Sequence, residues 1–281
     1  MKDLIHQSDD NKFIPITSFS AGTGSQVRPD VYYFTNQIVN IFFVANRQNS
    51  EWVLIDAGMP HSGEKILEEA AKRFPENPRP VAIILTHGHF DHVGGIVKLI
   101  KQWDVPVYAH PLEFPYLTGE MDYPEPDTSV EGGLLAKISS IYPHKAINIQ
   151  DYVVPLPSDG TVPALPGWEW LHTPGHSPGH VSFYRNSDKT LIAGDAFVTV
   201  RADSLYKVLI QKKEVNGPPR YLTTDWQEAW NSVKKLKCLV PELAITGHGT
   251  AMEGEELRQG LEKLVAGFDK IAIPDYGKFV P

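Results

Sequence analysis

The run Val81-Ala-Ile-Ile-Leu-Thr-His-Gly-His-Phe-Asp-His92 joins a short apolar segment directly to a loop crowded with histidines. An apolar segment of this length, without alternation, is typical of a strand buried on both faces. Three imidazoles and one carboxylate then follow within six residues, and the strand end fixes where they point. Histidine is the commonest metal ligand among side chains, and with aspartate it suits zinc or iron. The stretch therefore predicts a metal site, and a loop of solvated histidines is the alternative.

Three later loops pair a glycine with a side chain that can bind a metal. They are Thr173-Pro-Gly-His176, Gly194-Asp195 and Gly247-His248-Gly249, and each follows a predicted strand. Glycine lets the backbone turn sharply and approach its neighbours closely. Because loops at the ends of neighbouring strands can converge, these loops favour the metal site over the solvated alternative.

The pattern of the remaining chain predicts a layered α/β fold, because strands begin each half and helices follow between them. Strands are predicted at 31–34, 38–44, 52–55, 81–85, 106–109, 168–171, 181–184, 191–193 and 243–245. Helices are predicted at 62–74, with Ser62 as the cap, and at 94–103, 224–236 and 253–268. The segment 111–131 is rich in proline and acidic residues, which indicates a covering loop.

The composition excludes several classes of protein. With 42% hydrophobic and 21% charged residues, the 281-residue chain is neither disordered nor collagen-like. The one cysteine, Cys238, can form neither an internal disulfide nor a cysteine-based zinc cluster, and we expect it to be buried. The net charge of −8 argues against a nucleic-acid partner. No stretch approaches the roughly 18 apolar residues of a membrane span, and the first residues lack a signal-peptide core, so we expect a cytoplasmic protein.

Taken together, the motifs resemble the metallo-β-lactamase superfamily of hydrolases. The resemblance rests on the HxHxDH pattern at 87–92, on the later histidines and aspartate, and on Asp56 in Leu54-Ile-Asp-Ala-Gly58. It implies a single domain over residues 1–281, an αββα sandwich of two mixed β-sheets flanked by helices. It also implies substrate-covering loops around 111–131 and 198–222.

The resemblance further implies two Zn²⁺ ions per chain, with iron or manganese as alternatives. The residues that it assigns to the first ion are His87, His89 and His176. Those that it assigns to the second ion are Asp91, His92 and His248, with Asp195 bridging both. Three neutral imidazoles leave an open tetrahedral position on one ion, and two carboxylates offset the charge of a second dication.

The implied reaction is hydrolysis of an ester, lactone or thioester bond of a small molecule. Water bound by the two ions would have its pKa lowered toward about 7, which gives a hydroxide nucleophile at neutral pH. Asp91 is expected to act in catalysis by handling a proton. Asp56 is expected either to orient the metal loop or only to cap a turn, and the sequence leaves both open.

Several alternatives stay open within this family resemblance. They are a phosphodiester hydrolase, a mono-iron enzyme similar to persulfide dioxygenases, and a metal-binding protein without turnover. Asp195 stands where the best-known secreted zinc β-lactamases have cysteine, so antibiotic hydrolysis is not expected. Glyoxalase II enzymes and lactonases share the ligand set. Few predicted helices follow Asp195, which weakens the glyoxalase II alternative. Val198 stands where lactonases have tyrosine, so a lactonase would need Tyr206 or Tyr221 as a donor.

Other residues are open to a functional or a structural interpretation. For His180 the sequence favours a hydrogen bond or packing over metal ligation, and Trp226 with Trp230 is expected in the core. A pocket role and a solvated position both stay open for His61 and His110. The aromatic residues that either line a pocket or hold the loops down are Phe114, Tyr116, Tyr123, Tyr206 and Tyr221. A basic cluster, which either attracts an anionic substrate or forms a solvated face, comprises Lys207, Lys212, Lys213 and Arg220.

Overall fold

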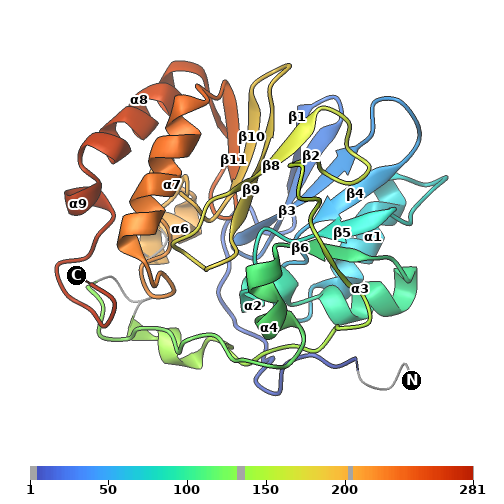
Figure 1. Cartoon of the computed structure of the whole chain (residues 1–281), viewed down its shortest axis with the longest axis horizontal. Coiled ribbons are helices and arrows are strands. Elements are labelled where there is room, and N and C mark those ends of the chain that lie inside the picture. The colour runs from blue at the N-terminus through green and yellow to red at the C-terminus, as the bar shows by residue number, and fades with distance from the viewer. Residues whose placement is uncertain (1–4, 132–136, 202–204, 281) are drawn as a thin grey trace. The chain divides into compact units, whose positions relative to one another are not determined.

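The computed structural model describes residues 5–131, 137–201 and 205–280. The described chain divides into two units, each built on one β-sheet (Figure 1). The first unit comprises Met1–Ile16, Ser20–Tyr123 and Pro143–Pro166. The second comprises Thr17–Phe19, Pro124–Tyr142 and Gly167–Pro281. The single domain over 1–281 stays a prediction.

The sheet of the first unit has seven strands that follow one another in chain order. They are β1 (Gly24–Arg28), β2 (Val31–Asn36), β3 (Val39–Ala45), β4 (Trp52–Ile55), β5 (Ala82–Ile84), β6 (Val107–Ala109) and β7 (Val153–Pro155). Strands β1 to β4 pair antiparallel, whereas β4 to β7 pair parallel, so the sheet is mixed. Because β4, β5 and β6 are parallel, their carboxyl ends lie at one edge, where Asp56, the histidine loop and His110 follow.

Helices cover one face of this sheet and bury its apolar side chains (Figure 1). They are α1 (Gly63–Arg73), α2 (Phe90–Val93), α3 (Ile96–Trp103) and α4 (Phe114–Leu117), which follows the 3-10 turn η2 (Pro111–Glu113). Ile66 of α1 and Ile100 of α3 share a core with Ile83 of β5, and all three are fully buried. The helix predicted from Gly94 begins instead at Ile96, and α2 precedes it as a separate turn.

Two details differ from the sequence prediction in this unit. Ser62 precedes α1 but makes no capping bond, because its hydroxyl donates to the Ala57 carbonyl at 2.7 Å. Gly94 and Gly95 separate α2 from α3, and their N–H groups donate to the carbonyls of Gly58 and Ala57. A Cβ at Gly94 would lie 2.2 Å from the Met59 backbone, so only glycine allows this close approach.

The sheet of the second unit has five strands in the order β12-β11-β10-β9-β8. They are β8 (Trp168–His172), β9 (Val181–Arg185), β10 (Thr190–Gly194), β11 (Leu243–Thr246) and β12 (Met252–Glu253). Only β10 and β11 pair parallel, so this sheet is mixed as well. β8 and β10 both run antiparallel to β9, so the carboxyl ends of β8, β10 and β11 share one edge.

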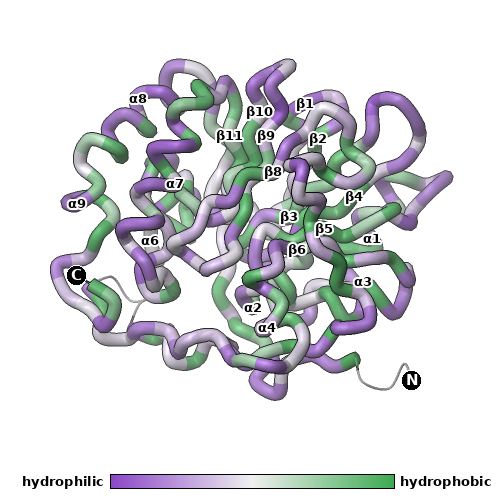
Figure 2. The backbone as a smooth tube through the Cα atoms, in the orientation of Figure 1, coloured by the Kyte–Doolittle hydropathy of each residue, from purple (hydrophilic) through white to green (hydrophobic). Residues whose placement is uncertain are grey.

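Two long helices supply most of the apolar face that packs on the second sheet. The helices of this unit are α6 (Leu205–Ile210), α7 (Trp226–Cys238), α8 (Gly254–Ala266) and α9 (Phe268–Ile271), with the 3-10 turn η3 (Ser139–Ile141). Asp225 caps α7 by accepting a hydrogen bond from the Glu228 N–H. Trp226 is a buried core residue, as expected, and the partly buried Trp230 packs against the core and stacks on Phe268 at 5.7 Å. Along α7 and α8, hydrophobic residues recur at helical spacing among hydrophilic ones, so each helix has one apolar face (Figure 2).

The expected covering loops contain more structure than the sequence indicated. The segment 111–131 begins with η2 and α4, and the segment 198–222 contains α6 and a bridge between Val198 and Asn216. Cys238 is exposed, so the expectation that it is buried is wrong: it ends α7 on the face turned to solvent. Within the described ranges, no helix has both the length and the apolar character to cross a membrane.

Candidate metal centre

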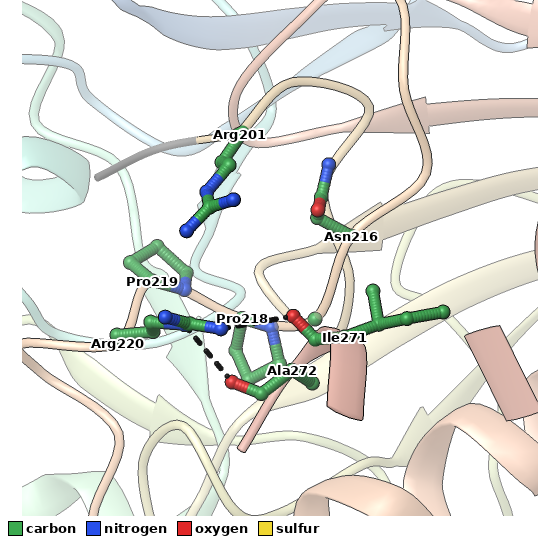
Figure 3. A pocket seen from close by; sticks show the side chains of 8 residues that line it. Arg201, Asn216, Pro218, Pro219, Arg220, Ile271 and Ala272 are labelled. Atoms are coloured by element: carbon green, nitrogen blue, oxygen red, sulfur yellow. Dashed lines mark hydrogen bonds between the residues drawn. The ribbon is translucent and has the colours of Figure 1, made fainter. Parts of the chain in front are cut away.

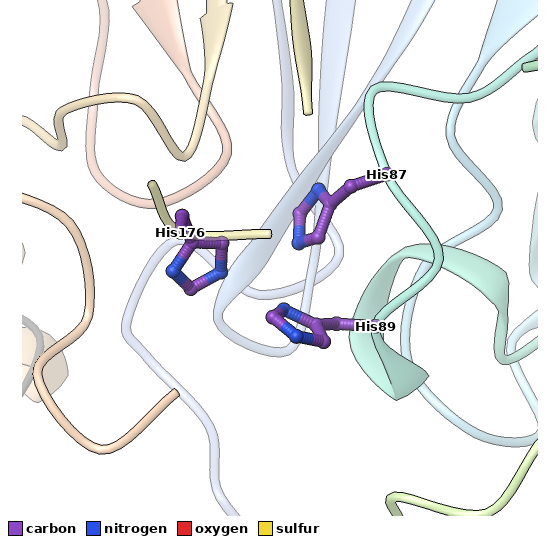
Figure 4. A group of neighbouring side chains, drawn as sticks. All are labelled: His87, His89 and His176. Carbon is purple, nitrogen blue, oxygen red and sulfur yellow. The ribbon is translucent and has the colours of Figure 1, made fainter. Parts of the chain in front are cut away.

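The first unit gathers four candidate ligands directly after β5. His87 lies on the loop, His89 immediately precedes α2, and Asp91 and His92 lie on α2. All four side chains are buried. The ring centroids of His87 and His89 are 4.7 Å apart, and those of His87 and His92 are 4.2 Å apart. Figure 4 shows the side chains of His87 and His89 extending to the same side of the loop. The structure thus brings the predicted histidine loop together as one buried cluster.

Asp56 organises this loop from the end of β4. Its Oδ1 accepts the backbone N–H of Thr86 at 2.8 Å, and its Oδ2 accepts the Thr86 hydroxyl at 2.8 Å. The same Oδ2 accepts Nδ1–H of His92 at 2.8 Å. A carboxylate in this position fixes the tautomer of His92 and leaves Nε2 to act as a ligand. Asp56 therefore does more than cap a turn.

Thr86 fixes the tautomer of His87 in the same way. Its hydroxyl hydrogen points to Asp56, so its oxygen accepts Nδ1–H of His87 at 3.0 Å. The lone pair of His87 then lies on Nε2. Within the described residues, Nε2 of His87, Nε2 of His92 and Oδ1 of Asp91 are buried atoms that make no hydrogen bond.

A further pair of residues holds the peptide between His87 and His89. The Gly88 N–H donates to Oε2 of Glu113 at 2.9 Å and to the Tyr123 hydroxyl oxygen at 3.0 Å. The Tyr123 hydroxyl donates in turn to the same Glu113 oxygen. Burial raises the pKa of Tyr123 well above its usual range, and the charge of Glu113 and the hydrogen bond to it raise it further, so Tyr123 keeps its proton. The sequence analysis did not find Glu113, because its local sequence carries no motif.

The second unit gathers the other three candidates at the shared edge of β8, β10 and β11. His176 follows β8, Asp195 follows β10 directly, and His248 follows β11. Nε2 of His176 lies 3.5 Å from Oδ2 of Asp195, and Nε2 of His248 lies 3.2 Å from the same oxygen. All three side chains are buried. Figure 4 includes His176 on its loop.

Hydrogen bonds set the tautomer of His176. The Thr223 hydroxyl donates to the Pro219 carbonyl at 2.8 Å, so its oxygen accepts Nδ1–H of His176 at 3.2 Å. Nε2 of His176 then faces the Asp195 carboxylate. Buried imidazoles grouped around a carboxylate are a donor set that fits a metal ion.

His180 supports Asp195 rather than adding a ligand. It is fully buried, and its Nε2 accepts the backbone N–H of Asp195 at 2.8 Å. Its Nδ1 lies 2.9 Å from the hydroxyl of Thr173. Both ring nitrogens are thereby engaged, which confirms the hydrogen bond that the sequence favoured.

Threonines also fix the loop of His248. The Thr246 hydroxyl and the Thr199 N–H both donate to the His248 carbonyl, at 2.6 and 3.2 Å. A Cβ at Gly249 would lie 2.4 Å from the Thr199 hydroxyl, and Gly249 has a φ of 100°. The sequence analysis missed these threonines. Thr86 and Thr246 stand beside ligands in the chain and could have been found, whereas Thr199 and Thr223 are distant from them in sequence.

Most of the expected pocket aromatics hold loops down. Tyr116, Tyr123 and Tyr221 are buried, and Tyr116 stacks on Tyr123 at 3.8 Å. Phe114 is partly buried against the core of the first unit. The side chain of Tyr206 lies outside the described residues.

The remaining candidates have separate surroundings. Arg220 is nine-tenths buried and donates to the carbonyls of Ile271 and Ala272, at a pocket that Arg201 also lines (Figure 3). Lys212 and Lys213 are exposed, and the side chain of Lys207 lies outside the described residues. His110 accepts the Leu112 N–H, and the exposed His61 borders a cavity of about 310 Å³ in the first unit.

Comparison with known proteins assigns the family. The model of the metallo-β-lactamase superfamily matches residues 35–248. This chain belongs to the metallo-β-lactamase superfamily. Two mixed sheets with flanking helices are the fold of that superfamily, so the predicted fold class is confirmed.

Relatives and solved structures extend the superfamily match over most of the chain. The chain is 46% identical to the probable metallo-hydrolase YflN of Bacillus subtilis, over 90% of this chain and 96% of that protein. It is 30% identical to TTHA1623, solved in a di-iron-bound form, with a TM-score of 0.55 over 82% of this chain and 94% of that one. ST1585 of Sulfolobus tokodaii, 18% identical with a TM-score of 0.56 over 90% and 85%, shares the fold.

Proposed function

We propose that the protein is a dinuclear zinc-dependent hydrolase that cleaves an ester, lactone or thioester bond of a small molecule. The superfamily match and the resemblance to a probable metallo-hydrolase support the assignment as a metal-dependent hydrolase. The observation that carries the proposal is the buried donor cluster around Asp195, in which Nε2 of His176 and Nε2 of His248 lie 3.5 and 3.2 Å from one carboxylate oxygen.

In the proposed centre, His87, His89 and His176 would hold one ion, and Asp91, His92 and His248 would hold the other. Asp195 would be a ligand of both. When bound, such a pair supplies a hydroxide nucleophile at neutral pH and polarises the substrate oxygen.

The chain's own residues prepare the donors for this role. Asp56 and Thr86 bind Nδ1 of His92 and of His87, which leaves Nε2 of each ring available to the metal. Thr223 does the same for His176. His180 holds the backbone of Asp195. In the proposal, Asp91 receives a proton during turnover. Its burial in a cluster of imidazoles suits that role.

The donor chemistry favours zinc at the first ion. Three neutral imidazoles with one open position are typical of catalytic zinc, whereas mixed histidine and carboxylate sets also bind iron or manganese. The di-iron form of TTHA1623 keeps iron as the second candidate. The proposal also includes a small-molecule substrate, no nucleic-acid or membrane partner and a cytoplasmic location. The net charge of −8 supports the absence of a phosphate-backbone partner.

The test is elemental analysis of the purified protein, combined with Asp195→Ala. We expect roughly two ions per chain in the wild type and a large loss of both metal and turnover in the variant. Asp269→Asn, an exposed carboxylate in the same unit, is the control and should match the wild type. Full metal content and full activity in Asp195→Ala would overturn the proposal.

A panel of substrates then distinguishes the reaction classes. Turnover of an ester, lactone or thioester supports the proposal, and exclusive turnover of a phosphodiester replaces it with the phosphodiesterase. About one iron per chain with oxygen uptake on a persulfide replaces it with the mono-iron enzyme. Bound metal without turnover of any class leaves a metal-binding protein.

A further inference from the structure

The peptide at Gly88 connects two proposed ligands of the same ion. Its N–H donates to Oε2 of Glu113 and to the Tyr123 hydroxyl, at 2.9 and 3.0 Å. Because the Tyr123 hydroxyl also donates to that oxygen, the three groups form a closed triangle of hydrogen bonds. We call Glu113 and Tyr123 the Gly88 clamp.

The clamp is buried and therefore costly to maintain. Glu113 is 0% exposed and Tyr123 is 6% exposed. A buried carboxylate is unfavourable unless hydrogen bonds compensate for its lost hydration. An apolar pair of the same shape would fill this space without that cost. The hydrogen bonds that Glu113 accepts from Gly88 and Tyr123 compensate for its burial and point to a role for this carboxylate.

The clamp also contacts the ligand side chain. The ring of Tyr123 lies 4.5 Å from the ring of His89, between centroids, and its other neighbour is Tyr116 at 3.8 Å. A Cβ at Gly88 would lie 2.7 Å from the Tyr123 hydroxyl oxygen and 3.2 Å from Leu117. Gly88 thus packs directly against the clamp, and no space is left for a side chain at this position.

We propose that Glu113 and Tyr123 are positioning residues that hold the His87–Gly88–His89 peptide in the conformation in which both imidazoles can bind one metal ion. This inference rests on the proposed function. The clamp acts on the loop through the backbone N–H of Gly88 and through the ring of His89. Without it, the peptide can rotate and the two imidazoles separate, so the metal-free loop must be ordered when the ion binds.

The experiment measures metal affinity by chelator competition in Tyr123→Phe and Glu113→Ala. Tyr123→Phe keeps the ring and removes the hydroxyl, and Glu113→Ala removes the acceptor. We expect each to weaken binding of the ion that His87 and His89 would hold by about 10-fold or more, as loss of other residues that orient metal ligands does. Amide hydrogen exchange of Gly88 in the metal-free variants should accelerate together with this loss.

Two further variants separate positioning from packing. Glu113→Gln retains a carbonyl oxygen that can accept both hydrogen bonds, so it should restore most of the affinity lost in Glu113→Ala. Tyr116→Phe removes a hydroxyl from the same aromatic stack without touching Gly88, so its metal affinity and Gly88 exchange should equal those of the wild type. Thermal unfolding of each metal-free variant shows whether the fold is intact.

The outcomes distinguish failure of the inference from failure of the proposed function. If the wild type binds no metal, the proposed function fails. If the wild type binds metal and Tyr123→Phe binds it within about twofold of the wild type, the clamp has no positioning role. An equal loss in Tyr116→Phe and Tyr123→Phe also overturns the inference, because it shows a packing effect. If Glu113→Ala does not fold, Tyr123→Phe alone decides.

Discussion

At the scale of single residues, the candidate centre depends on acceptors that select one imidazole tautomer. Asp56 shows this most clearly, because three donors converge on its two oxygens. Its φ of 64° lies in the left-handed region, which aspartate tolerates better than most residues. The residue that follows β4 therefore binds the residue that follows β5 and orients His92, a candidate ligand on α2.

Asp56→Asn should weaken metal binding more than it weakens the fold. The NH2 group of asparagine would face one of the three donors and cannot accept its hydrogen bond. His92 or Thr86 would then lose a bond that orients it. We expect the affinity for the ion that His92 would hold to fall about 10-fold or more, measured by chelator competition. The partly exposed Glu51→Gln, in the same unit, is the control. Unchanged affinity in Asp56→Asn would mean that the bond to His92 does not prepare a ligand.

The sequence identified the candidate metal ligands more readily than the residues that orient them. The histidine loop is visible because its ligands lie within six residues and directly after an apolar strand. Glu113 and Thr223 are invisible by the same reasoning, because only the folded chain brings them to Gly88 and His176. Hydrogen bonds between distant segments leave no periodic pattern in a sequence.

At the scale of elements, apolar strands were predictable, whereas a polar strand and a strand containing proline were not. The strands around Phe42 and Leu54 match the prediction because apolar and β-branched residues dominate them. β1 and β7 were missed. β1 is largely polar and exposed, β7 contains Pro155, and pairing with β2 and β6 makes them strands. α2 was missed because its four residues lie in a stretch crowded with polar side chains, and α3 begins at Ile96, two residues after the predicted start.

Gly94→Ala should destabilise the first unit strongly. The added Cβ would lie 2.2 Å from backbone atoms of Met59, which cannot move aside as a side chain can. We expect a loss of about 3 kcal/mol in the free energy of unfolding, measured by urea denaturation. Gly267→Ala is the control, because its Cβ would make only ordinary contacts from 3.5 Å. Equal stability of Gly94→Ala and wild type would show that the α2–α3 junction is not tightly packed.

At the scale of the whole chain, segments distant in sequence fasten the second unit. Oδ1 of Asp127 accepts the N–H and hydroxyl of Ser129, and Oδ2 accepts the backbone N–H of Lys278 at 2.5 Å. Burial alone would raise the pKa of Asp127, but these hydrogen bonds outweigh burial and lower it. The ionised carboxylate thus holds the last described residues against a segment about 150 residues earlier.

The contribution of Asp127 to stability should disappear in acid. Its pKa is lower in the folded protein than in the unfolded chain, so its stabilising effect is present above about pH 4 and falls as the pH drops through the folded value. The difference in unfolding free energy between wild type and Asp127→Asn should therefore shrink below pH 4. Urea denaturation from pH 7 to pH 3 measures it, with Asp269→Asn as the control. A difference that stays constant over this range would contradict the prediction.

The exposed thiol at the end of α7 offers a single site for thiol-specific labelling. Cys238 is the one cysteine in the sequence, so a thiol-reactive spin label attaches at one defined point without any engineering. If Mn²⁺ is loaded into the proposed centre, its paramagnetism broadens the label's signal according to their separation. The native protein therefore allows the distance from Cys238 at the end of α7 to the bound ion to be measured without any substitution.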